Sequence, residues 1–326
     1  MESRKPTYTD KQLESYLQRI GYTPRHDYDS NHYHDSSEPL LLNLRAEIDM
    51  DEFSALCELQ RRHLSAIPWG NSGLHYSQYH TISLNPQSLF EKMVEERRDG
   101  YCMENSGLFY HVLRSLGYLV YATGGRVSHA AAKGVDNGLY LSLGHMILIV
   151  IIKGAKYMVD VGFGNNCATA PLPLQEGATA TAIAPSEMRL VRESIAEFTD
   201  PSQKIWIYQV RYNPESKWVP QICFSEVEFL PQDFGVMNFS TSRSRTSWFT
   251  QIFVCMRMIL NERGTEIIGQ RVMSGKEVKQ RLHGETEVLQ ILETEDDRVK
   301  ALAKYFDMHL RESEIQGIRG LPSELK

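Results

Sequence analysis

Apolar residues recur at helical spacing along the first hundred residues and predict amphipathic helices. The segment Thr9-Asp10-Lys11-Gln12 has the form of a capping box that opens a helix, and apolar residues follow it on one face. A third helix is predicted to begin at Asn85-Pro86, because proline suits the first turn of a helix. A second helix is predicted between the first and the third. The residues on one of its sides are Phe53, Leu56, Cys57, Gln60 and Leu64.

After Gly117 the pattern changes to short apolar runs bounded by glycine, which is typical of strands. A helix is expected after Thr246, followed by further strands and a C-terminal helix. Residues 165–203 are rich in Ala, Pro, Thr and Gln, and we expect a connection that carries a peripheral excursion. The predicted strands are residues 119–121, 145–152, 156–161, 205–210 and 222–229.

Composition narrows the class of protein. Hydrophobic residues make up 42% of the 326 positions and charged residues 23%, as in ordinary globular proteins. The formal charge of −6 argues against a nucleic-acid partner, which usually meets a basic face. The longest apolar run, residues 146–152, is too short to span a bilayer, and no apolar signal segment follows Met1. We therefore expect no membrane association.

The cysteines and the N-terminal histidines bear on location and metal binding. The five cysteines are scattered, and no pair has the spacing of a zinc or redox motif. Reduced thiols are therefore expected, which favours a cytoplasmic location. His26, His32 and His34 could bind a metal, but no carboxylate or cysteine frames them, so a solvated loop is favoured. No metal site is predicted.

One cysteine stands at the predicted start of a helix. Gly100 allows a tight turn, and residues 103–116 predict a helix that places Cys102 at its N-terminus. Backbone N–H groups and the helix dipole there favour a thiolate and could bind an oxyanion. We expect Arg97 and Arg98 to add positive potential nearby. By itself this motif also fits a buried structural cysteine.

A thiolate nucleophile needs a base, and the base needs an orienting partner. His145 lies at the mouth of an apolar strand, and Asp160 lies within the next one, where an unpaired charge would be costly. The two are natural partners. Direct facing across a hairpin needs a turn centred between residues 152 and 153, whereas Gly154 favours a turn one or two residues later. A bulge or a longer-range pairing is therefore required.

The residues around Cys102 resemble the signature of a known family. Residues 98–105 are similar to the Arg-Gly-Gly-(aromatic)-Cys-x-Glu-x-Asn motif of arylamine N-acetyltransferases. His145 and Asp160 match the second and third members of that family's catalytic triad, in the same order. Further matching segments, in the correct order, are residues 13–22, 63–69, 160–164 and 233–249.

The resemblance implies an α+β fold with a cysteine-proteinase-like core. We expect a helical bundle in residues 1–84 and a β-barrel domain in residues 85–203, which includes the Cys-bearing helix and the excursion. Residues 204–326 would form an α/β lid and the C-terminal segment. The protein is expected to be a monomer or a weak oligomer.

The resemblance also implies a ping-pong reaction in which Cys102 takes an acyl group from acetyl-CoA or another acyl-CoA. An arylamine or arylhydrazine then removes it, while His145 shuttles protons and Asp160 orients His145. The residues that match CoA contacts are Leu141, Ser142, Thr246 and Ser247. Those that match the acceptor pocket are Phe163, Asn165 and Cys167.

The chain departs from the family pattern at two positions. Asp99 stands where glycine is usual, and Gly70 stands where glutamate is usual. We hypothesise that Asp99 supplies the carboxylate that Arg98 would otherwise lack. Arg243 and Arg245 could meet CoA phosphates or a carboxylate on the acyl chain, such as that of malonyl, although a solvated basic loop fits equally well.

Two other classes of function fit parts of this sequence. A papain- or transglutaminase-like hydrolase also uses Cys, His and Asp, but it would hydrolyse its substrate without CoA. A non-enzymatic binding module on the same fold would be expected to carry a broken triad. Release of CoA from acyl-CoA donors, with and without an arylamine, separates these alternatives.

Overall fold

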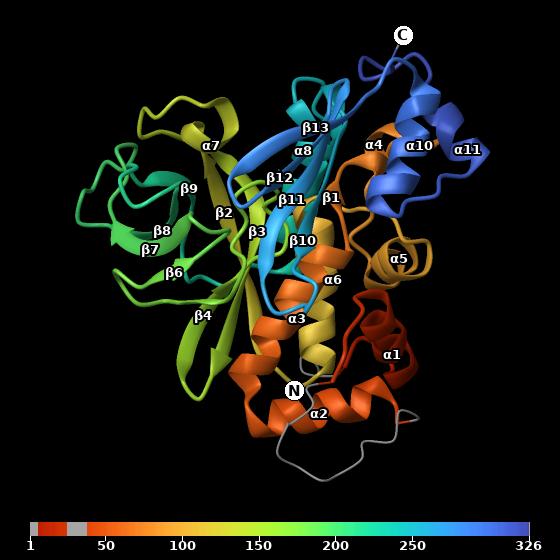
Figure 1. Cartoon of the computed structure of the whole chain (residues 1–326). Coiled ribbons are helices and arrows are strands. Elements are labelled where there is room, and N and C mark those ends of the chain that lie inside the picture. The colour runs from red at the N-terminus through yellow and green to blue at the C-terminus, as the bar shows by residue number, and fades with distance from the viewer. Residues whose placement is uncertain (1–5, 25–37, 326) are drawn as a thin grey trace.

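The computed structural model describes residues 6–24 and 38–325, so His26, His32 and His34 lie outside the described residues. A barrel-like sheet occupies one side of the molecule, and a second sheet lies between it and the C-terminal helices (Figure 1). The longer helices are α1 (Asp10–Arg19), α2 (Leu40–Met50), α3 (Glu52–Ala66), α5 (Pro86–Phe90), α6 (Cys102–Ser115), α7 (His129–Lys133), α8 (Pro231–Arg243) and α10 (Glu295–Phe306). The remaining helical segments are α4 (Ser72–His75), the π-helix η2 (Glu91–Glu95), α9 (Trp248–Gln251), α11 (Glu312–Ile315) and the 3₁₀ helix η3 (Gln316–Ile318).

The larger sheet has eight strands in the order β5-β4-β3-β2-β9-β8-β7-β6. Neighbouring strands are antiparallel, and the sheet curls until β5 contacts β7. Its strands are β2 (Leu119–Ser128), β3 (Tyr140–Ile152), β4 (Ala155–Val159), β5 (Leu172–Pro173), β6 (Thr179–Thr181), β7 (Glu187–Glu193), β8 (Ile205–Arg211) and β9 (Val219–Phe224).

The smaller sheet has five antiparallel strands in the order β1-β10-β11-β12-β13. Its first strand comes from the N-terminal region, whereas the other four follow one another late in the chain. A separate core lies between this sheet and α10 and contains Cys255, Leu302 and Phe306. The strands are β1 (Trp69–Gly70), β10 (Val254–Leu260), β11 (Ile267–Ser274), β12 (Glu277–Leu282) and β13 (Glu285–Ile291).

Strand β3 separates two apolar cores. Residues 146, 148 and 150 face the core shared with the helices, whereas Ile147 and Ile149 face the barrel interior. Because both faces are covered, the run reads as continuously apolar rather than alternating. Helix α6 packs on β2 and β3, and its Leu108, Phe109 and Val112 are fully buried. The nucleophile candidate thus begins a helix held in the middle of the molecule.

The helices predicted for the first region are confirmed. Thr9 and Gln12 form the expected capping box of α1, and the Asn85 side chain caps α5 with Pro86 in its first turn. The helix expected after Thr246 is the single turn α9. Helices α2 and α8 were not predicted. In α8 the exposed Val236 and Phe239 blur the apolar stripe that signals a surface helix.

The expected boundary between residues 203 and 204 crosses the larger sheet. Strands β8 and β9 pair with β7 and β2, so residues 205–224 belong to the barrel-like sheet rather than to a lid. The expected peripheral excursion in residues 165–203 is wrong for its second half, because β7 pairs along its whole length with β8. Buried Met188 and Leu190 on β7 complete the barrel core.

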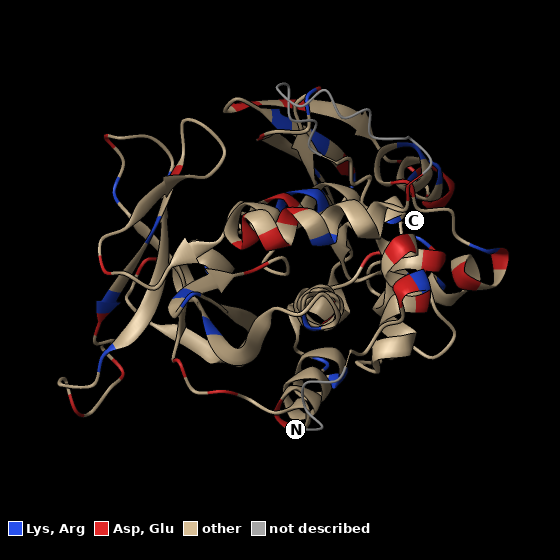
Figure 2. Ribbon diagram, turned by 90° about the horizontal axis from the view of Figure 1, so that it is seen from below, with Lys and Arg blue, Asp and Glu red and all other residues tan. Residues whose placement is uncertain are grey.

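Charged residues of both signs lie along the outer helices and loops (Figure 2). Their interspersion accords with the modest formal charge of −6. Within residues 6–24 and 38–325, no helix is long and apolar enough to cross a membrane.

Candidate active site

Cys102 is the first residue of α6, as predicted, and its side chain is only 4% exposed. The preceding Tyr101 has extended backbone, and its N–H donates to Glu104 Oε2 at 3.1 Å, which stabilises the start of the helix. The Cys102 thiol donates to the carbonyl oxygen of Gly144 at 3.5 Å. Cys102 is thus at the end of α6 where free N–H groups and the positive end of the helix dipole are found.

The predicted base and orienting carboxylate meet directly. His145 Nε2 and Asp160 Oδ2 lie 2.6 Å apart, and both side chains are at most 3% exposed. The other carboxylate oxygen, Asp160 Oδ1, accepts the N–H of Gly162 at 2.8 Å. Because Nε2 is engaged with Asp160, Nδ1 is the ring nitrogen that remains for Cys102.

The hairpin reaches this geometry by ending early. The turn lies at Lys153-Gly154, both with positive φ, and the last β3–β4 pair before the site is Leu148 with Val159. Asp160 comes directly after β4 rather than within it, so its backbone is not held by the pairing of β3 with β4. A bulge in the β2–β3 pairing leaves Gly144 as an extra residue beside His145.

The surroundings of His145 favour its protonated form. Burial alone would lower the pKa of the imidazole, but the Asp160 carboxylate and a hydrogen bond with Cys102 raise it to about 10. A thiol beside a base that favours its protonated form can pass its proton to that base, which leaves the sulfur nucleophilic. Burying the ion pair of His145 and Asp160 costs the hydration of both groups, and their mutual attraction together with the Gly162 N–H bond to Asp160 offsets that cost.

Cys102 and His145 line a cavity of about 330 Å³. Among the residues predicted for ligand contacts, Leu141, Phe163 and Asn165 line it as well. The Phe163 ring meets the His145 ring edge-on, with centroids 5.3 Å apart. The remaining wall is formed largely by residues not predicted from sequence, which include Trp69, Val127, Gln221, Trp248, Phe249 and Val272.

Other predicted contacts fall outside this wall. Ser142 is exposed on β3, and Thr246 is exposed before α9. Ser247 is at the N-cap position of α9, whose Trp248 does line the cavity. These three residues lie beside the cavity rather than on it. Cys167, expected in the acceptor pocket, is 2% exposed, and its thiol donates to the carbonyl oxygen of Asp160 at 3.3 Å.

The turn after Gly164 explains the position of Cys167. The N–H of Cys167 donates to the carbonyl of Gly164, which directs the cysteine side chain inward beneath Asp160. Burial raises the pKa of the Cys167 thiol well above its usual range, so it is a packing residue rather than a second nucleophile.

Gln60 is a supporting residue that the sequence placed on one face of a helix but to which it gave no role. Its amide nitrogen donates to the carbonyl oxygens of Asp160, at 3.2 Å, and Ala168, at 2.8 Å. The side chain is fully buried on α3. The available signal was a polar residue on an apolar helix face, since buried amides are kept for hydrogen bonds.

A second polar chain fixes the loop before Cys102. Tyr16 on α1 contacts His63 Nδ1 at 3.0 Å, and His63 Nε2 lies 3.0 Å from Asn105 Oδ1. The Asn105 amide in turn donates to the carbonyl oxygen of Gly100. Burial lowers the pKa of His63 to about 3, so this histidine stays neutral and serves as a structural link.

The hypothesis that Asp99 pairs with Arg98 is wrong. Arg98 forms a two-point ion pair with Glu314, at 2.6 and 3.1 Å, and donates to the carbonyl oxygen of His309. Asp99 instead accepts the N–H and the hydroxyl of Ser72. The sequence placed Asp99 next to Arg98, but consecutive side chains in an extended loop point in different directions.

The expectation that Arg97 and Arg98 add positive potential at Cys102 is also wrong. Arg97 pairs with Asp307, as Arg98 does with Glu314, so both charges are neutralised by the C-terminal segment. Arg243 and Arg245 are exposed, and neither is among the described residues that line the cavity.

Known proteins resemble this chain over most of its length. The N-acetyltransferase family matches residues 52–315. An N-malonyltransferase of Gibberella moniliformis is 36% identical over 326 residues, which span 96% of this chain and 92% of that protein. Arylamine N-acetyltransferase 2 of Mus musculus is 25% identical over 255 residues, spanning 74% and 76%.

Solved structures share the fold. An arylamine N-acetyltransferase from Salmonella typhimurium has a TM-score of 0.73 at 22% identity and covers 95% of this chain and 98% of its own. The Mycobacterium marinum arylamine N-acetyltransferase in complex with CoA has a TM-score of 0.71 at 24% identity, covering 95% and 99%. These likenesses confirm the expected α+β fold. The chain therefore belongs to the arylamine N-acetyltransferase family of acyl-CoA-dependent N-acyltransferases.

Proposed function

We propose that this protein transfers a short acyl group from CoA to an arylamine or arylhydrazine through a thioester on Cys102. The observation that carries the proposal is that Cys102 and His145 line one cavity at the start of α6, and that Asp160 contacts His145. A nucleophile, a base and a group that orients the base are the elements that acyl transfer requires.

In the first half-reaction, Cys102 Sγ attacks the carbonyl carbon of the acyl-CoA thioester. The bond from that carbon to the CoA sulfur breaks, and the proton held on His145 passes to the departing CoA sulfur. N–H groups at the start of α6 are placed to stabilise the negative oxygen of the tetrahedral intermediate. Asp160 holds the ring of His145 in position throughout.

In the second half-reaction, the unprotonated amine attacks the Cys102 thioester. Its nitrogen forms the amide bond, the carbon–sulfur bond to Cys102 breaks, and His145 accepts the proton that the amine nitrogen loses. The apolar wall around Trp69, Phe163 and Phe249 suits an aromatic acceptor. The sulfur must remain a free thiol between turnovers, which a reducing compartment such as the cytoplasm would ensure.

Malonyl-CoA is the donor we favour over acetyl-CoA. Support comes from the Gibberella moniliformis relative, whose name describes an N-malonyltransferase. The polar side chains Asn165, Asn166 and Gln221 on the cavity wall could accommodate the free carboxylate of a malonyl group. Leu141, Ser142, Thr246 and Ser247 remain our candidates for CoA contacts at the edge of the cavity.

Intact-mass measurement tests the proposal directly. Incubation with acetyl-, propionyl- or malonyl-CoA and no amine should add one acyl group, which peptide mapping should place on Cys102. Arylamine should then discharge it, with parallel lines in double-reciprocal plots. Cys102→Ala should abolish both steps, whereas Cys57→Ala, at a half-buried cysteine on α3, should change neither.

Four results would contradict this function. An acyl group on another residue, or comparable transfer by Cys102→Ala, would remove Cys102 from the mechanism. Rapid release of CoA with hydrolysis and no transfer to amine would favour a hydrolase. No release of CoA from any donor would favour a binding module.

A further inference from the structure

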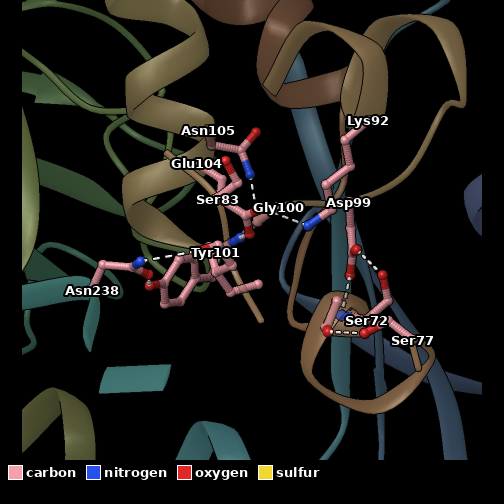
Figure 3. A network of polar contacts seen from close by, with 12 residues as sticks. Ser72, Ser77, Ser83, Lys92, Asp99, Gly100, Tyr101, Glu104, Asn105 and Asn238 are labelled. Atoms are coloured by element: carbon pink, nitrogen blue, oxygen red, sulfur yellow. Dashed lines mark hydrogen bonds and ion pairs between the residues drawn. The ribbon is translucent and has the colours of Figure 1, made fainter. Parts of the chain in front are cut away.

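Asp99 is a fully buried carboxylate three residues before Cys102. Its Oδ2 accepts the backbone N–H of Ser72 at 3.1 Å, and its Oδ1 accepts the Ser72 hydroxyl. Ser72 opens the short helix α4, directly after β1. Asp99 therefore ties the loop that leads to the nucleophile to a segment almost thirty residues earlier in the chain (Figure 3).

The loop of residues 99–101 is also held by a pair of charged residues, Lys92 and Glu104. Lys92 Nζ lies 2.5 Å from Glu104 Oε1, and Glu104 Oε2 accepts the N–H of Tyr101 (Figure 3). Burial raises the pKa of Asp99, and the nearby ammonium group of Lys92 opposes that effect. Lys92 is thus close to two buried carboxylates, those of Asp99 and Glu104, which lie on either side of Cys102 in the sequence.

Gly70 lies so close to the Asp99 carboxylate that no side chain fits at position 70. Its φ is not positive, so its backbone does not by itself demand glycine. A Cβ at this position would lie 2.2 Å from Asp99 Oδ2 and 2.7 Å from the carbonyl oxygen of Val254. Glycine is therefore needed here because the Asp99 carboxylate and β10 fill the space that a side chain would occupy.

The close approach of β1 to the loop before Cys102 brings two walls of the catalytic cavity together. The N–H of Gly70 donates to the carbonyl of Gly100, at 3.0 Å, and the N–H of Gly100 donates to the carbonyl of Pro68, at 3.2 Å. Trp69, between them, lines the cavity together with Cys102. The spacing of Trp69 and Cys102 thus depends on how closely β1 approaches the loop at Asp99.

We propose that Asp99 is a positioning residue for acyl transfer: by anchoring Ser72 beside Gly70, it fixes the distance between the Trp69 wall and the Cys102 sulfur. This inference rests on the proposed function, because it assigns a role within that same site. Asp99 does not contact the reacting atoms, so its effect should appear in the rate of the chemical step rather than in the affinity for CoA.

The test compares Asp99→Asn and Ser72→Ala with the unaltered protein in single-turnover acylation. We expect the acylation rate to fall about 10- to 100-fold in both, because a shift of about 1 Å at a nucleophile has an effect of this size. The KM for acyl-CoA should change little. The control is Ser77→Ala, whose hydroxyl donates to Gly73 in the same short helix region and should leave the rate unchanged.

Alkylation of Cys102 by iodoacetamide separates the two proposals, since it needs no acyl-CoA. Slower alkylation in Asp99→Asn and Ser72→Ala, but not in Ser77→Ala, supports the positioning role even if no acyl-CoA acylates the protein. Unchanged acylation and alkylation rates in a folded Asp99→Asn protein would overturn it. If Asp99→Asn does not fold, Ser72→Ala decides the question by the same two rates.

Discussion

At the scale of single residues, the chemistry depends on three side chains that are almost completely buried. Cys102, His145 and Asp160 are at most 4% exposed, so little water competes with their mutual hydrogen bonds. Burial would keep His145 neutral, and the contact with Asp160 is the largest of the effects that reverse this by raising its pKa. The nucleophile therefore depends on a carboxylate that it does not touch.

Replacing that carboxylate should remove most of the activity. In Asp160→Asn the amide cannot stabilise an imidazolium, and we expect acylation to fall about 100-fold or more. The contribution of the ion pair to stability is present below the unfolded pKa of 6.5 and is lost as pH rises through about 10. Asp136→Asn, at an exposed position, is the control. Near-normal turnover of folded Asp160→Asn would remove Asp160 from the triad.

The two exposed arginines before α9 allow a test of donor recognition. Because neither Arg243 nor Arg245 lines the cavity, we expect their replacement by alanine to slow malonyl and acetyl transfer by the same factor. Such a result assigns them to the CoA moiety or to solvent. Measured kcat/KM values for both donors decide this. A loss confined to malonyl-CoA would assign the responsible arginine to the acyl carboxylate.

At the scale of elements, His63 joins three helices through polar contacts. It lies on α3, and its ring nitrogens meet Tyr16 on α1 and Asn105 on α6. Asn105 then holds the loop before Cys102. A buried, neutral imidazole is a suitable link between elements because each nitrogen makes one defined hydrogen bond.

This link should be sensitive to acid. The folded-state pKa of His63 is about 3 against an unfolded value of 6.5. Its neutral form therefore stabilises the fold above pH 6.5, and that contribution is lost as pH falls toward 3. Between pH 7.5 and 4.5 the loss is about 2–3 kcal/mol. The free energies of unfolding of the unaltered protein and His63→Gln should thus converge by that amount. An equal difference at both pH values would contradict this expectation.

At the scale of the whole molecule, the C-terminal segment closes over the loop that leads to the nucleophile. Arg97 and Arg98 pair with Asp307 and Glu314, more than two hundred residues later. Arg311 adds an ion pair with Glu96, at 2.8 Å. The last helices therefore brace the start of α6 although they contribute no residue to the described cavity wall.

Breaking the most buried of these pairs should destabilise the protein. Arg98 and Glu314 side chains are 7% and 17% exposed, so Glu314→Gln removes the charged partner of a largely buried guanidinium, which keeps its bond to the carbonyl oxygen of His309. We expect a loss of about 1–3 kcal/mol, measured by urea unfolding. The control is Glu312→Gln, at an exposed position two residues earlier. Equal stabilities of the two variants would show that the pair contributes nothing.

The sequence by itself determined the local elements and the identity of the reactive residues. Capping residues and apolar spacing predicted α1, α5 and α6, because these signals act within four residues of one another. A charged residue in an apolar run singled out Asp160, because burial without a partner would be too costly. Both inferences needed no knowledge of distant segments.

Only the tertiary structure decided which distant groups meet. The partner of Arg98 is Glu314 rather than the adjacent Asp99, and Cys167 turns inward beneath Asp160 instead of lining the cavity. Strand β7 completes the barrel although its segment lacked a clear strand signal. These outcomes depend on side-chain direction, strand register and packing between segments far apart in the chain, and local spacing carries no information about them.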